Sequence, residues 1–163
     1  MSLGTFLVPW TTHIRSAREL ARRTFEAANE SGDLTFASYS REQVNSNMLA
    51  CGDPLAEVQR EAESGLEFAR KARFSLLEDF ITGELQLIRT LRGLTPAFGC
   101  FDDAGFEELA FERHLSSSFA LAMPHLFYWL QKLQARCLAN DYATAIAASK
   151  RVAPLVQFVP PIF

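Results

Sequence analysis

The chain has 163 residues, of which 48% are hydrophobic and 21% are charged, and its formal net charge is -3. This composition excludes a disordered polypeptide and suits one folded domain with a core of its own. The acidic balance provides no basic stripe of the kind that binds a phosphate backbone, so we expect no nucleic-acid partner.

The three cysteines, Cys51, Cys100 and Cys137, are far apart and show no CxxC spacing. We therefore predict reduced thiols in a cytoplasmic protein, with neither a disulfide framework nor a zinc site. No segment resembles a signal peptide, and no apolar run reaches the roughly 18 residues that span a bilayer, so we expect no membrane insertion. We interpret residues 1–3 as an expression leader and the apolar segment 159–163 as a cut inside a longer protein.

Three short breaks divide the chain: Gly32-Asp33-Leu34, Gly52-Asp53-Pro54 and Asn140-Asp141-Tyr142. Gly or Asn adopts the left-handed conformation that ends one helix, and the following Asp accepts hydrogen bonds from the free N–H groups that open the next. These three breaks predict antiparallel helices joined by tight turns.

Apolar residues recur at three- and four-residue steps along seven segments, which predicts seven amphipathic helices. In chain order we expect them at about 12–29, 34–50, 54–72, 76–91, 104–114, 122–139 and 142–152. No segment shows the alternation of a half-buried strand, so we expect no sheet.

The apolar positions also predict which helices and faces are buried. The helix at 76–91 is the most apolar and is expected to lie centrally. Asp102 or Asp103 is expected to cap the helix at 104–114. The core face of the next helix is expected to consist of Leu126, Leu130, Leu133 and either Leu138 or Cys137. That of the last helix is expected to consist of Ala145, Ile146 and Ser149.

The sequence carries none of the common catalytic signatures. It has three histidines and lacks HExxH, a Glu-x-x-His pair, a phosphate-binding Gly-rich loop and GxSxG. We therefore predict no catalytic, cofactor-binding or metal-binding residue and expect a protein that is not an enzyme.

Two clusters are candidates for partner binding. The first is Phe127-Tyr128-Trp129 with Lys132 and Arg136, because three consecutive aromatic residues cannot all face one core. We favour packing of these rings inside the helical stack, and a ligand-binding platform remains the alternative.

The second cluster contains Gln86, Arg89 and Arg92, on or just after the most apolar helix. We favour a structural role in which arginine anchors a buried acid within the stack. The alternative is that arginine reaches a carboxylate of a partner.

The segment Ala139-Asn140-Asp141-Tyr142-Ala143-Thr144-Ala145-Ile146 is similar to the helix-turn-helix junction of tetratricopeptide repeats. Trp129 lies where such a repeat often has its aromatic residue, and Ala145 lies at its second-helix Ala. Leu133 and Arg136 stand at the repeat's usual Gly/Ala and Tyr positions, so the match departs from the pattern there. The helix pairs also have about the length of two-helix repeats. The predicted fold class is all-α: about seven helices in antiparallel pairs, a tetratricopeptide-like α-solenoid fragment forming one domain over residues 1–163.

A longer resemblance covers almost the whole chain. It rests on the segments Gly52–Val58, Gly65–Ala72 and Gln86–Thr95. These segments resemble a helical region in large bacterial signalling proteins. In those proteins a Ser/Thr-kinase-like domain and an AAA-type ATPase precede the helical region, and a GAF domain, often with a sensor histidine kinase, follows it. None of that family's kinase or nucleotide-binding motifs occurs here, so no catalytic role carries over.

The resemblance implies a non-catalytic scaffold or regulatory segment, whose partners are neighbouring domains of the same protein or a regulatory protein. Its oligomeric state stays open. A hypothesis from another class is a small-molecule sensor with an apolar pocket lined by Phe101, Phe106, Phe127 and Trp129.

Overall fold

The computed structural model describes residues 14–158, and within them it contains seven α-helices and no β-strand. The predicted leader, the predicted start of the first helix and the apolar final segment lie outside the described residues. The α-helices are α2 (Ile14–Glu30), α3 (Leu34–Ala50), α4 (Leu55–Lys71), α5 (Ser75–Leu91), α6 (Glu108–Ser116), α7 (Ala122–Leu138) and α8 (Tyr142–Val152), with 3₁₀ turns η2 (Phe119–Leu121) and η3 (Val156–Phe158). The all-α prediction is confirmed.

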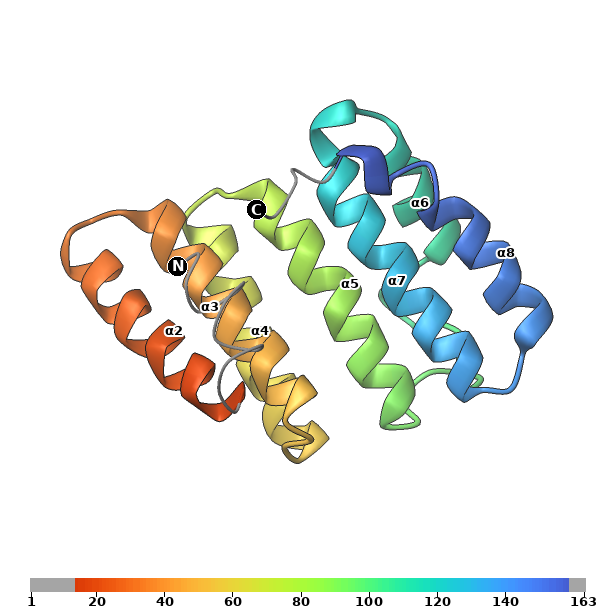
Figure 1. Ribbon diagram of the computed structural model, residues 1–163, viewed down its shortest axis with the longest axis horizontal. Coiled ribbons are helices and arrows are strands. Elements are labelled where there is room, and N and C mark those ends of the chain that lie inside the picture. Colours follow the sequence, from red (N-terminus) through yellow and green to blue (C-terminus); the bar gives the residue numbers. More distant parts are fainter. Residues whose placement is uncertain (1–13, 159–163) are drawn as a thin grey trace. The chain divides into compact units, whose positions relative to one another are not determined.

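The chain divides into two compact units, Met1–Ile81 and Thr82–Phe163, and the boundary falls inside α5. In the first unit α2 packs against α3, and α3 packs against α4 (Figure 1). In the second unit α7 packs against both α8 and α6. The predicted antiparallel pairing of helices is therefore present in each unit. No helix within residues 14–158 combines the length and apolar character needed to cross a bilayer.

Five helices end in the same hydrogen-bonded turn, in which a residue with positive φ follows the last helical turn. Gly32 and Asn140 take this position after α2 and α7, with φ of 75° and 57°. The next residue then donates back across the turn, as Asp33 N does to Ala28 O at 2.9 Å. Such turns satisfy carbonyls that a helix end leaves without partners. The predicted role of Gly and Asn at the breaks is confirmed.

The aspartates after these breaks behave differently from one another. Asp33 accepts from Phe36 N at 3.1 Å and Asp141 accepts from Thr144 N at 3.2 Å, so both open a helix as predicted. Hydrogen bonds from Thr144 hold the pKa of Asp141 below its ordinary value of 3.8. The prediction is wrong at Asp53, because Pro54 precedes α4 and the Asp53 carboxylate pairs with Arg18 of α2.

Small residues bring the helices of the first unit together. Ala17 and Ala21 of α2 and Ala62 and Ala69 of α4 are buried. At Gly65 of α4 an added methyl group would lie 3.4 Å from Ile81 Cδ1, in ordinary contact distance. Aromatic rings fill the remaining space.

These rings meet edge to face. Phe25 packs on Phe68 at 5.7 Å between ring centroids, and Tyr39 packs on Phe74 at 5.4 Å. Arg41 of α3 lies over both Phe25 and Phe68, so it links α2 to α4.

The predicted start of α6 at residue 104 is wrong. Asp103 and Phe106 pair through their backbones, and the Asp103 carboxylate accepts from Gly105 N at 2.7 Å. These bonds close a local turn in place of a first helical turn. Asp102 still accepts from the N–H of Glu108, at the true start of the helix.

The predicted core faces of α7 and α8 are also wrong in part. Leu126 and Ala145 are buried, but Leu130 and Ile146 are exposed. The buried positions include Tyr128, Lys132 and Ala135 on α7 and Ala148 on α8, so α7 presents a different stripe from the one that leucine spacing indicates.

Arg73 provides a test of the turn geometry, because it takes the left-handed conformation with φ of 54° and its side chain is exposed. We expect Arg73→Gly to raise the free energy of unfolding by about 0.5–1 kcal/mol, since glycine removes the steric penalty but loses more entropy on folding. Urea unfolding monitored by circular dichroism measures this change.

Arg60→Gly is the matched control, because Arg60 is exposed in the interior of α4. There glycine is expected to destabilise by about 1 kcal/mol. A loss of stability in both variants would contradict the role assigned to the Arg73 turn.

Candidate functional site

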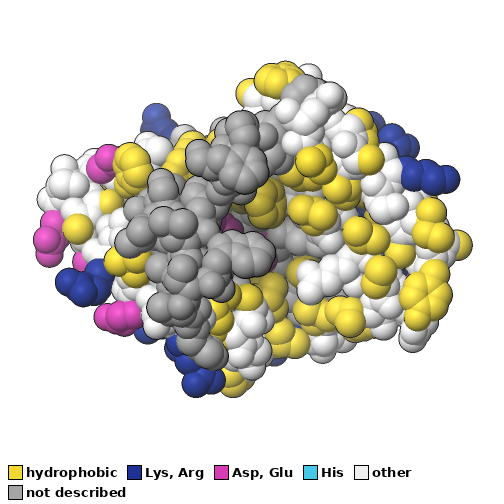
Figure 2. All heavy atoms as spheres, viewed as in Figure 1, with side chains coloured by type: hydrophobic (Ala, Val, Ile, Leu, Met, Phe, Trp, Pro, Cys, Tyr) yellow, Lys and Arg dark blue, Asp and Glu magenta, His cyan; other side chains and the backbone are white. Residues whose placement is uncertain are grey.

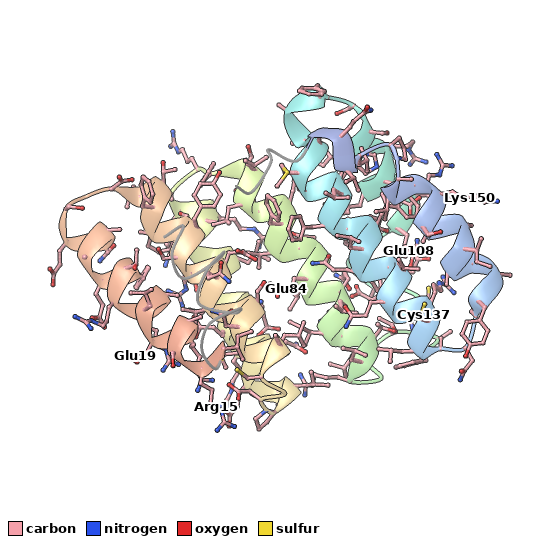
Figure 3. The ribbon with its side chains drawn as sticks, in the orientation of Figure 1. Arg15, Glu19, Glu84, Glu108, Cys137 and Lys150 are labelled. Carbon is pink, nitrogen blue, oxygen red and sulfur yellow. The ribbon has the colours of Figure 1, made fainter. Side chains whose placement is uncertain are left out.

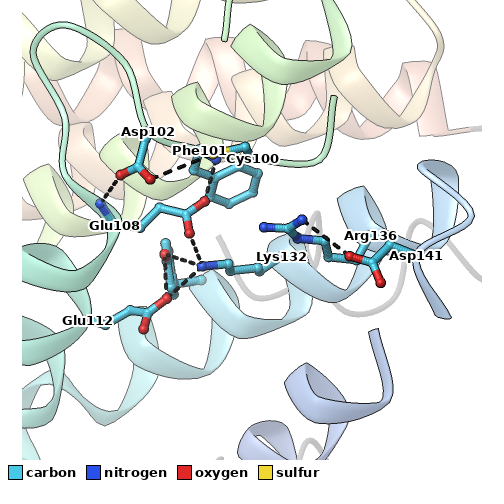
Figure 4. Close-up of polar contacts among 9 residues, drawn as sticks. Cys100, Phe101, Asp102, Glu108, Glu112, Lys132, Arg136 and Asp141 are labelled. Atoms are coloured by element: carbon cyan, nitrogen blue, oxygen red, sulfur yellow. Dashed lines mark hydrogen bonds and ion pairs between the residues drawn. The ribbon is translucent and has the colours of Figure 1, made fainter. Parts of the chain in front are cut away.

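The second unit contains a buried lysine held between two glutamates. The Lys132 side chain of α7 is 8% exposed, and its ammonium pairs with Glu108 and with Glu112 Oε1, the latter at 2.7 Å (Figure 4). One turn earlier on α7, the Tyr128 hydroxyl donates to Glu112 Oε1 at 3.0 Å and lies 3.5 Å from Lys132 Nζ. A charge this deeply buried is tolerated only when it is fully paired.

Glu108 extends the cluster to the loop before α6. Its second carboxylate oxygen accepts the backbone N–H of Phe101, and its own N–H donates to Asp102 Oδ1 at 2.7 Å. Phe101 is fully buried and packs edge to face on Tyr128, with 5.8 Å between ring centroids. One carboxylate therefore fixes the loop to both α6 and α7.

Residues of α5 hold the same loop from another side. Arg89 Nε lies 2.8 Å from Asp103 Oδ2, whose side chain is nearly buried. The Gln86 amide, oriented to satisfy its neighbours, donates to Phe101 O at 3.3 Å and to Asp103 Oδ2 at 3.2 Å. Thr90 Oγ1 accepts from Gly99 N at 2.8 Å. Arg89 thus has the structural role that the sequence favours, and Gln86 shares it.

The remaining candidates for partner binding are placed in different surroundings. Tyr128 and Lys132 are buried in the second unit and reach no partner while it is folded. Trp129 is half-buried, Arg136 Nη1 lies 3.4 Å from Asp141, and Arg92 is exposed. Partner binding through Trp129, Arg136 and Arg92 stays a prediction. Sequence reasoning missed Glu108, because nothing in the helical spacing links it to Lys132.

The Tyr128–Lys132 pair resembles an acid–base arrangement, but its surroundings favour the protonated tyrosine. A lysine one helical turn away lowers the pKa of a tyrosine only where its charge is not neutralised. Here two carboxylates neutralise the Lys132 ammonium. Burial, and then the charges of Glu112 and Glu108, raise the pKa of Tyr128 far above its ordinary value. The phenol therefore stays protonated and donates its hydrogen bond to Glu112.

Three possible metal ligands also lie close together. One ligand atom each from Cys100, Asp102 and Glu108 falls within 4.8 Å of the others. Both oxygens of Glu108 are already engaged by Lys132 and by the Phe101 N–H. Burial raises the pKa of the Cys100 thiol, which disfavours the thiolate that a metal requires. These residues fit the ion-pair cluster better than a metal centre.

The four aromatic residues proposed for an apolar sensor pocket lie in different surroundings. Phe101 and Phe106 join a packed series of rings through Tyr128 and Phe111. Phe127 is exposed. Trp129 lines a groove of the second unit.

No protein-family model, curated protein or solved structure matches this chain. The resemblance to tetratricopeptide-like regions of signalling proteins therefore rests on the residues alone.

Replacing the buried lysine tests whether its charge is needed. Lys132→Met leaves Glu108 and Glu112 buried without a cation, so we expect a loss of about 3–5 kcal/mol in the free energy of unfolding. Urea titration of Trp129 fluorescence, with Trp10 replaced by Phe, reports on this unit. Lys150→Met is the control, because Lys150 points away from α8 (Figure 3), and less than about 0.5 kcal/mol is expected. Equal effects of the two substitutions would refute the role of Lys132.

His125 gives the second unit a pH dependence of known sign. Burial lowers its pKa below 6.5, the nearby Arg151 lowers it further and Glu112 opposes the shift. The unfolded chain then binds a proton more readily than the folded one. The contribution of neutral His125 to stability is therefore fully present above pH 6.5 and is lost as pH falls through the lowered pKa of the folded state. We expect the free energy of unfolding to depend less on pH between 7 and 5 in His125→Gln than in the unchanged protein. If the free energy of unfolding changed equally with pH in His125→Gln and in the unchanged protein, His125 would not be the source of this pH dependence.

Proposed function

We propose that this chain is a non-catalytic helical scaffold of a multidomain signalling ATPase or kinase, which contacts neighbouring domains of that protein. The observation that carries the proposal is an exposed apolar surface on the last helix pair. Figure 2 supports it, because hydrophobic side chains gather on the face over α7 and α8 while Lys and Arg lie at its margin.

Five side chains define this surface, which we call the α7–α8 face: Phe127, Leu130 and Leu138 on α7, and Tyr142 and Ile146 on α8. Each is between 40% and 61% exposed. Their three-, four- and eight-residue spacings place them along one stripe of each helix. A stripe of this kind normally packs against another element, because covering it gains about 25 cal/mol per Å².

The rest of the unit favours contact over chemistry. Lys132, Arg89 and Asp103 are engaged by internal pairing, so the buried polar groups are committed to structure. In helical arrays each pair of helices contacts only its neighbours. A domain that covers the α7–α8 face would therefore influence the whole array through the pair it touches.

The proposal is tested with the segments that flank these residues in the parent protein, expressed separately and titrated calorimetrically against the chain. We expect one of them to bind, and Ile146→Glu to weaken binding by at least about tenfold, because it places a charge in an apolar contact.

Lys150→Glu is the matched control on the same helix, and it should leave the affinity within about twofold. Circular dichroism should show that both variants keep their helical content. The proposal fails if no flanking segment binds, or if Ile146→Glu and Lys150→Glu bind equally well.

A further inference from the structure

A groove of about 300 Å³ lies in the second unit beside the Lys132 cluster. Its walls come from α6, α7 and the end of α8, and include Glu112, Arg113, His125, Trp129, Arg151 and Leu155. This volume is at the lower end of the range for small-molecule sites. None of the five residues of the α7–α8 face lines it.

Two arginines provide positive charge at this groove. Arg151, in the last turn of α8, places its guanidinium 5.8 Å from the centre of the Trp129 ring and forms no ion pair with the described residues. Arg113 is largely exposed and reaches Glu107 only at 3.9 Å. Both guanidiniums therefore have donors to spare.

The acidic group of the groove balances them only in part. Glu112 accepts from the Lys132 ammonium and from the Tyr128 hydroxyl, and Lys132 shares its single positive charge between Glu112 and Glu108. His125 is neutral near pH 7, because burial lowers its pKa. The groove thus contains two arginines and one carboxylate that is already engaged by other donors.

Trp129 adds a donor without an acceptor. Its indole N–H is buried and has no hydrogen-bond partner among the described residues. A buried donor left in this state costs about 1–3 kcal/mol, so most such groups in proteins are satisfied by water or a ligand. Leu109 and Leu155 supply apolar surface in the same groove.

We propose that this groove binds a small organic carboxylate with a flat apolar body. The carboxylate pairs with Arg113 and Arg151, whose planar guanidiniums match it in geometry. The apolar body lies against Trp129, Leu109 and Leu155. This assignment is independent of the contact role of the α7–α8 face.

Benzoate is the probe, and benzamide is its uncharged counterpart of the same shape. The full chain carries Trp10→Phe, so that Trp129 alone reports by fluorescence. We expect saturable quenching by benzoate, and at least about tenfold weaker binding of benzamide, because the amide offers no charge to the arginines.

Arg151→Gln and Arg113→Gln should each weaken benzoate binding by about fivefold or more, with circular dichroism confirming the fold. Lys150→Gln is the matched control, since this neighbour of Arg151 points away from the helix (Figure 3) and is absent from the groove lining. It should leave the affinity unchanged. Ile146→Glu should also bind benzoate normally, which separates this site from the α7–α8 face.

Three results would overturn the assignment: no saturable response to benzoate, equal affinity for benzamide, or unchanged benzoate binding in both arginine variants. Arg113→Gln keeps the test decisive if Arg151→Gln loses its fold, because Arg113 is largely exposed on α6.

Discussion

The second unit depends on the requirement that a buried ammonium have anionic partners. Lys132 of α7 is buried in the core of the second unit, where an unpaired charge would cost several kcal/mol. Glu108 and Glu112, both from α6, satisfy it, and Glu108 also accepts from the backbone of the loop before α6. The pairing of one buried charge therefore fixes α6, α7 and the loop before α6 together. Gln86 and Arg89 hold the same loop from α5.

This arrangement determines where function can lie. The side chains that could do chemistry, Tyr128, Lys132 and Cys100, are paired, buried or held in the form that is not reactive. The groups left over are of two kinds. One is the apolar α7–α8 face, suited to another protein surface, and the other is the arginine-rich groove around Trp129. Our two proposals, contact with another protein and binding of a small carboxylate, each use one of these groups.

Local signals in the sequence account for most of the helices. Gly32 and Asn140 specify their turns because few residues tolerate positive φ, and Asp33 and Asp141 specify helix starts through bonds only three residues long. The turn at Arg73 has the same geometry without such a residue, so only its position between two apolar stripes revealed it.

The site could not be predicted in the same way. Lys132 and Glu108 are 24 residues apart, and helical periodicity treats a lysine as a surface residue. The periodicity therefore predicted Leu130 on the core face, although Leu130 is exposed. It also predicted a buried stripe that leaves out Tyr128 and Lys132, which are buried. Long-range pairing of this kind leaves no periodic trace, although Arg89 on an apolar helix did indicate a buried acid.

A double-mutant cycle between Lys132 and Glu108 measures how far each side chain depends on the other for its contribution to stability. Lys132→Met, Glu108→Gln and the double variant are compared by urea unfolding of the second unit. We expect a coupling free energy of about 1–3 kcal/mol, with the double variant more stable than Lys132→Met alone, because the double variant no longer buries the Glu108 charge without its cation. Additive effects within about 0.5 kcal/mol would contradict it, since the two groups would then stabilise the unit independently.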